Sequence, residues 1–160
     1  LGINDSGEAE DRYTTIEQFE ENYRRFAALI REKGANPIFA SPIVCPYSSP
    51  ITKTFGDRAD SVKKIAAEEN VPFLDVNGYL YDEFTNINDA EAVRENYFLY
   101  KLVEQGYITE TQRANHVNTG IKDNGYDFTH LSVKGANHVA DVTAELLKNV
   151  GCDLAKYLNK

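Results

Sequence analysis

The sequence has few cysteines and no arrangement of them that would suit a metal. Cys45 and Cys152 are far apart among the 160 residues, and neither belongs to a CxxC motif or to a Cys/His cluster with zinc spacing. Two readings of the pair stay open. They are two buried thiols, or, if the protein is exported, they form a disulfide. We therefore expect no metal site.

Basic residues are also scarce, because 17 Lys and Arg face 25 Asp and Glu and the formal net charge is −8. Nucleic acid and anionic membranes bind basic patches, so we expect neither as a partner. No apolar run approaches the roughly 18–20 residues of a membrane span. The opening segment, residues 1–5, lacks the basic and apolar parts of a secretory signal. That absence says little about location, because the chain does not begin with Met.

What the sequence does contain is an ordinary globular composition, with 42% apolar and 26% charged residues in a length that fits one domain. Periodicity predicts helices over residues 14–34, 57–69 and 133–149 and buried strands over residues 37–40 and 71–76. Short strands alternating with helices predict an α/β fold with a parallel sheet covered by helices on both faces. Only two strands and the end of a third, before Asn4, can be counted. A sheet this small would leave an open edge, so either further strands escape the periodicity analysis or amino-terminal strands are missing.

The first predicted helix has two possible starts, a capping box of Thr14 with Glu17 or one of Thr15 with Gln18. Its expected inward face is the set Ile16, Phe19, Tyr23, Phe26, Leu29 and Ile30. Residues 77–123 are less regular. Because this connection is long, we expect part of it to shape a cleft.

Polar residues follow the predicted strands. Asn4, Ser41 and Asp75 stand at or just past carboxyl ends, where α/β proteins gather their active sites. Asn4 lies in Gly2-Ile3-Asn4-Asp5, which is expected to form a tight turn. The Asn4 amide can donate to a developing oxyanion there, or the residue can serve only an Asx turn.

Asp127 and His130 precede the last predicted helix, which Ser132 can cap. A histidine that acts as a general base needs a partner to fix its tautomer, and a carboxylate three residues earlier can be that partner. The other interpretation is that the two side chains only satisfy the amino terminus of the helix.

Taken together, Gly2-Ile3-Asn4-Asp5 and the stretch Asp127-Phe128-Thr129-His130-Leu131-Ser132-Val133-Lys134-Gly135-Ala136 resemble the SGNH (GDSL-like) hydrolases, and most of all their rhamnogalacturonan acetylesterase group. The resemblance runs from Leu1 to about Leu147. It implies a flavodoxin-like three-layer α/β/α sandwich, deacetylation of a plant cell-wall polysaccharide, no cofactor, and a secreted or cell-surface location.

Carried onto this sequence, the resemblance makes His130 the general base, Asp127 the residue that orients it, and Asn4 an oxyanion donor. Asp5, Ser41 and His116 are candidate substrate contacts. The aromatic residues Tyr97, Phe98 and Tyr100 can stack on sugar rings, although core packing is the commoner use. His138 is expected to be structural.

The sequence departs from the family in one respect, since neither the Gly-Asp-Ser motif with its nucleophile nor the Gly motif of the oxyanion hole is found. Gly56-Asp57-Arg58 lacks the serine, and Ser6 and Ser41 are not on the required turn. We therefore expect residues 1–160 to be the carboxyl-terminal portion of a single SGNH domain. A non-catalytic carbohydrate-binding or scaffold remnant is the alternative, as is a lipase or thioesterase with the same machinery.

Overall fold

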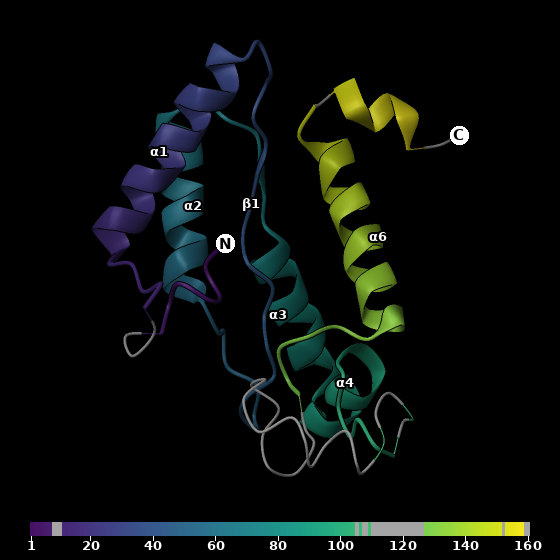
Figure 1. The fold of residues 1–160 in the computed structure, drawn as a ribbon. Helices are drawn as coiled ribbons and strands as arrows, with labels where there is room; N and C mark the ends of the chain where they lie inside the picture. The colour runs from purple at the N-terminus through teal and green to yellow at the C-terminus, as the bar shows by residue number, and fades with distance from the viewer. Residues whose placement is uncertain (8–10, 105, 107–108, 110–126, 152, 159–160) are drawn as a thin grey trace. The chain divides into compact units, whose positions relative to one another are not determined.

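The computed structural model describes residues 1–7, 11–104, 106, 109, 127–151 and 153–158 (Figure 1). They fall into two units. The first unit comprises Leu1–Val44, Phe55–Leu80 and Asp141–Lys160, and the second unit comprises Cys45–Thr54 and Tyr81–Ala140. Among the described residues, no helix is both long enough and apolar enough to cross a membrane.

The first unit is an α/β arrangement in which helices pack beside a short parallel sheet. Its helices α1 (Ile16–Glu32) and α2 (Gly56–Glu68) lie side by side next to β1 (Phe39–Ala40) (Figure 1). Strand β1 pairs in parallel with β2 (Phe73–Leu74), with Phe39 opposite Phe73 and Ala40 opposite Leu74. The predicted α/β class with parallel strands is confirmed.

Both strands are shorter than predicted, and prolines explain where they begin. Pro37 and Pro72 have no N–H to donate to a sheet ladder. The pairing runs instead from the N–H of Phe39, which donates to the Pro72 carbonyl at 2.9 Å, to the N–H of Ser41, which donates to the Leu74 carbonyl at 3.1 Å. Two residues of each strand are what remains of the predicted spans 37–40 and 71–76.

The predicted strand end before Asn4 was wrong as far as the described residues go. Gly2 has a φ of +95°, and its N–H donates to the Asp5 carboxylate at 2.6 Å. The N–H of Ser6 donates to the Ile3 carbonyl at 3.3 Å. These hydrogen bonds close a turn and leave the backbone out of any ladder. The predicted turn itself is present.

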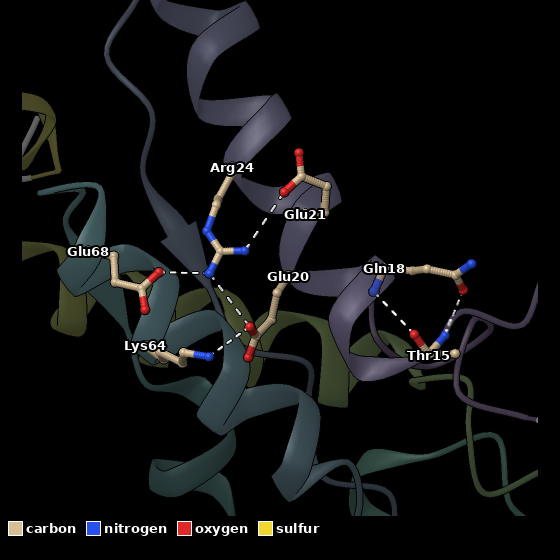
Figure 2. A network of polar contacts seen from close by, with 7 residues as sticks. All are labelled: Thr15, Gln18, Glu20, Glu21, Arg24, Lys64 and Glu68. Atoms are coloured by element: carbon tan, nitrogen blue, oxygen red, sulfur yellow. Dashed lines mark hydrogen bonds and ion pairs between the residues drawn. The ribbon is translucent and has the colours of Figure 1, made fainter.

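Helix α1 starts with the second of the two predicted capping boxes. The N–H of Gln18 donates to the Thr15 hydroxyl at 3.2 Å, and the Gln18 side chain accepts from the N–H of Thr15 at 3.0 Å (Figure 2). The inward face was predicted only in part, since Phe26 and Leu29 are 38% and 44% exposed. The buried cluster that joins α1 to the sheet and α2 is Phe19, Tyr23, Ala27, Phe39, Val62, Ile65, Ala66 and Val71.

Charged side chains form a network at the edge of the contact between α1 and α2. Glu20 is buried, and its carboxylate accepts from Nζ of Lys64 at 2.8 Å and lies 3.6 Å from Nη2 of Arg24 (Figure 2). Arg24 also pairs with Glu68 at 2.8 Å. The hydrogen bond from Lys64 lowers the pKa of Glu20, so its carboxylate stays ionised beside the apolar cluster.

Three further helices and a 3-10 helix complete the described residues: α3 (Val76–Ile87), α4 (Ala90–Tyr97), α6 (Val133–Asn149) and η1 (Asp153–Tyr157). Helix α6 has the predicted bounds, and Ser132 caps it by accepting the N–H of Gly135 at 3.0 Å. Helix α4 is capped by Asp89, whose carboxylate accepts the N–H groups of Glu91 and Ala92. The residues at the end of α4 and just after it pair with the segment that carries the predicted catalytic residues.

Candidate active site

The turn from Asp127 to His130 holds its two titratable side chains together. Oδ2 of Asp127 lies 2.7 Å from Nδ1 of His130. Oδ1 of the same carboxylate accepts the backbone N–H groups of Thr129 and His130 at 2.8 and 2.9 Å. One carboxylate therefore shapes the turn and fixes the imidazole. Asp127 is buried while the His130 side chain is 68% exposed, so the imidazole can be reached from outside.

This geometry bears on the interpretation of the pair as a helix cap. The helix that follows is capped by the Ser132 hydroxyl, and the hydrogen bonds of Asp127 go to its own turn and to the imidazole. Asp127 is therefore not the cap of α6. The contact between the Asp127 carboxylate and Nδ1 is compatible with the prediction that His130 is a general base, in which Nε2 takes the proton.

The residues after α4 support the turn through the backbone. The N–H of Leu99 donates to the His130 carbonyl at 2.9 Å, and the N–H of Ser132 donates to the Tyr97 carbonyl at 3.0 Å. Phe98 and Leu131 form an isolated antiparallel bridge between these two contacts. The turn is thus fixed at its carboxyl-terminal side as well as from within.

Arg94 supports the same turn with its side chain. Its Nε donates to the Pro46 carbonyl at 2.8 Å and its Nη2 to the Ser48 carbonyl at 3.1 Å. The guanidinium carbon lies 4.8 Å from the centroid of the Phe128 ring, which also contacts Tyr100 at 5.5 Å. A planar guanidinium can donate along its edge and stack on its face at once, so Arg94 ties loop 45–54 to the Asp127–His130 turn.

Tyr47 forms a second link between this loop and the turn. Its hydroxyl and that of Thr129 are hydrogen-bonded at 2.8 Å. Burial raises the pKa of Tyr47 to about 12, so its hydroxyl keeps its proton at neutral pH. Neither Tyr47 nor Arg94 was predicted from the sequence. An aromatic residue in the polar, proline-containing segment 45–50 was the one available signal.

Cys45 lies at the base of the same loop and is fully buried. Its N–H donates to the Thr54 hydroxyl at 2.7 Å, and that hydroxyl donates back to the Cys45 carbonyl at 3.1 Å. Burial raises the pKa of the Cys45 thiol to about 11. Of the two readings of the cysteines, the structure gives Cys45 as a buried free thiol, while Cys152 lies outside the described residues.

We expect the Cys45 thiol to resist modification in the folded protein. At pH 8 a thiol with a pKa of about 11 is almost entirely protonated, and the thiolate is the reactive form. In a Cys152→Ser variant, a chromogenic disulfide reagent should release its anion only after a denaturant is added. Rapid stoichiometric reaction of the native protein would contradict the burial of Cys45.

The predicted site residues Asn4, Asp5 and Ser41 belong to the first unit. Asn4 is exposed, and its carbonyl accepts Nε of Arg12 at 3.2 Å. The carboxylate hydrogen bond of this turn is made by Asp5 to the N–H of Gly2. The Asp5 side chain is thereby part of the turn that carries Asn4.

Arg58 stabilises the turn that carries Asn4 by hydrogen bonds to backbone carbonyls. It is only 2% exposed, and Nη2 donates to the Asp5 carbonyl at 3.3 Å and also to the Thr14 carbonyl. Its Nη1 donates to the Thr15 carbonyl at 3.3 Å, and the guanidinium lies 4.8 Å from the centroid of the Phe19 ring. These bonds fasten the Asn4 turn to the start of α1.

Ser41 and Asp75 stabilise the start of α3. The Ser41 hydroxyl is buried, accepts the N–H of Asn77 at 2.8 Å and lies 3.4 Å from the Leu74 carbonyl. The Asp75 carboxylate accepts the N–H of Gly78 at 2.9 Å. The hydroxyl of Ser41 is therefore engaged within the protein.

The remaining candidates are His116, His138 and the aromatic residues Tyr97, Phe98 and Tyr100. His116 lies outside the described residues. Phe98 and Tyr100 are buried, and the Tyr97 ring packs 4.9 Å from that of His138, so these aromatics serve the core. His138 pairs with Glu83 at 2.7 Å, as expected of a structural histidine. Among the described residues, no three His, Cys, Asp or Glu side chains lie close enough together to hold a metal.

Comparisons with known proteins support the resemblance drawn from the motifs. No family model matches the chain. It is 29% identical over 150 residues to a protein of Bacillus subtilis named probable rhamnogalacturonan acetylesterase YesY, which covers 92% of this chain. It is 30% identical over 149 residues, or 91% of this chain, to the rhamnogalacturonan acetylesterase RhgT of the same organism. The chain spans 57% of the length of each relative. The predicted resemblance to rhamnogalacturonan acetylesterases is confirmed.

Proposed function

We propose that this chain forms part of a serine esterase that removes acetyl groups from a rhamnogalacturonan-like carbohydrate. The observation that carries the proposal is the 2.7 Å contact between Asp127 and Nδ1 of an exposed His130. The similarity to two proteins named rhamnogalacturonan acetylesterases supports the substrate class.

In the proposed mechanism, Nε2 of His130 takes the proton of a serine hydroxyl as that oxygen attacks the acetyl carbonyl. The serine is supplied by a Gly-Asp-Ser motif outside residues 1–160. Asp127 stabilises the imidazolium that forms, and the Asn4 amide donates to the oxyanion. The tetrahedral intermediate then collapses, and the imidazolium returns the proton to the departing sugar oxygen. This leaves an acetylated serine.

The second half of the reaction uses the same residues. His130 removes a proton from water as the water oxygen attacks the acetyl-enzyme, and a second tetrahedral intermediate forms. Its collapse releases acetate and returns the proton to the serine oxygen. Every step is a proton transfer or an acyl transfer, so the mechanism calls for no redox chemistry.

Acetate release by the full-length gene product tests the proposal. We expect hydrolysis of acetylated rhamnogalacturonan oligosaccharides and of p-nitrophenyl acetate, and labelling of one serine by a fluorophosphonate probe. Residues 1–160 alone should show neither. A full-length protein that carries Gly-Asp-Ser but hydrolyses no ester would favour the non-catalytic remnant. Faster hydrolysis of long-chain esters or acyl thioesters would favour a lipase or a thioesterase.

A further inference from the structure

One exposed aromatic side chain belongs to the support of the Asp127–His130 turn. Tyr47 is 42% exposed. Among the described residues of the second unit, it is the one exposed aromatic residue, while Phe98 and Tyr100 are buried. Part of the Tyr47 side chain is therefore accessible from outside the unit.

Although the ring is exposed, its position is fixed from three sides. Arg94 holds the carbonyls of Pro46 and Ser48, the residues that flank Tyr47. The N–H of Tyr47 donates to the Cys45 carbonyl at 2.9 Å. At the far end, the tyrosine hydroxyl is bonded to the side chain of Thr129. Hydrogen bonds therefore restrain both the backbone and the side chain of Tyr47. A ligand that binds against the ring would cost little further conformational entropy.

The hydroxyl contact also places the ring beside the dyad. Thr129 directly precedes His130, and its N–H is held by the Asp127 carboxylate. A tyrosine ring is a flat apolar surface with a polar hydroxyl, and here the hydroxyl is hydrogen-bonded to Thr129. A ligand can therefore meet the ring without displacing the hydrogen bond to Thr129.

We propose that Tyr47 is a substrate-binding residue whose ring stacks against the pyranose ring that carries the acetyl group. A pyranose presents a face of C–H groups between its hydroxyls, and an aromatic face complements it by excluding water from both. This inference rests on the proposed function, because it names the contact that the sugar makes at the same site. Arg94 holds the carbonyls of the two residues that flank Tyr47, so it acts through Tyr47 as a positioning residue.

Binding measured without turnover separates this role from catalysis. In the full-length His130→Ala protein, Tyr47→Leu should raise the Kd for acetylated rhamnogalacturonan oligosaccharides by about tenfold, measured by calorimetry. Tyr47→Phe and Thr129→Val keep the ring and should stay within about threefold of the parent. Tyr79→Leu removes a tyrosine of similar exposure, 45%, and should leave the Kd unchanged.

Turnover in the active protein gives the second readout. Tyr47→Leu should raise KM for the oligosaccharide by about tenfold, whereas KM for p-nitrophenyl acetate, which has no sugar, should change by less than about threefold. Should Tyr47→Leu fail to fold, as judged by thermal melting, Tyr47→Gln takes its place.

Several results would overturn the proposal. One is an equal loss of kcat on both substrates in Tyr47→Phe and Tyr47→Leu, because the hydroxyl would then only position the turn. Another is an unchanged Kd in Tyr47→Leu, and a third is the lack of measurable binding when Tyr47 is intact. Failure of the proposed function looks different, since the oligosaccharide would then bind in a Tyr47-dependent way and remain acetylated.

Discussion

Replacing His130 by alanine in the full-length protein is expected to lower kcat for acetate release by about 10³-fold or more. Asp127 holds the imidazole of His130 in place, and in the proposed mechanism this imidazole takes the proton of the serine. KM should change little, because the loss falls on the transition state. Acetate release from the oligosaccharide and p-nitrophenol release from its acetate ester measure the effect on two substrates.

His138 offers a matched control for this substitution. It too pairs with a carboxylate at 2.7 Å, that of Glu83, and the structure gives it packing partners such as Tyr97. His138→Ala should leave kcat within about threefold and lower only the melting temperature. If His130→Ala retained full kcat, or if both histidine variants lost it equally, His130 would not be the base.

Asp127→Asn tests the orientation of the same imidazole. An asparagine can still accept the two backbone N–H groups through its oxygen, but its NH₂ group would then face Nδ1 of His130. The imidazole would respond by keeping its proton on Nε2, where it cannot act as a base. We expect kcat to fall by up to about 10⁴-fold with little loss of stability. Glu83→Gln is the matching control and should retain kcat.

What the sequence predicted well was determined by local chemistry. The limits of α6 followed from apolar spacing and from Ser132, which caps the helix as expected. The closeness of Asp127 and His130 followed from their separation of three residues, since one turn brings such side chains together. In each case the interacting groups are neighbours along the chain, so a short motif contains all of the information.

Features that depend on distant partners could not be predicted. Tyr47 and Thr129 are separated by 82 positions, and the carbonyls that Arg94 holds lie 46 and 48 positions away. No short motif carries such pairings. The exposure of Phe26 and Leu29 has the same origin, because the packing of α1 against α2 and the sheet selects which part of its apolar surface is buried.

Gly135→Ala should destabilise the full-length protein, although alanine is normally the better helix former by about 1 kcal/mol. A Cβ at this position would lie 1.8 Å from the Tyr97 carbonyl oxygen, a backbone atom that cannot rotate away. That carbonyl accepts the N–H of Ser132, so relief of the clash must separate the start of α6 from the end of α4. We expect a loss of about 1–3 kcal/mol in the free energy of unfolding, measured by denaturant titration.

Asn137→Ala is the control, because it makes a change to alanine at an exposed position of the same helix. Without a clash, its helix propensity should raise stability by a few tenths of a kcal/mol, so the two variants are predicted to move in opposite directions. Because Ser132 follows the dyad turn directly, Gly135→Ala should also lower kcat at temperatures well below its melting point. A Gly135→Ala protein as stable and active as the parent would mean that α6 does not approach Tyr97 this closely. The close packing of the glycine would then not be what fixes the turn.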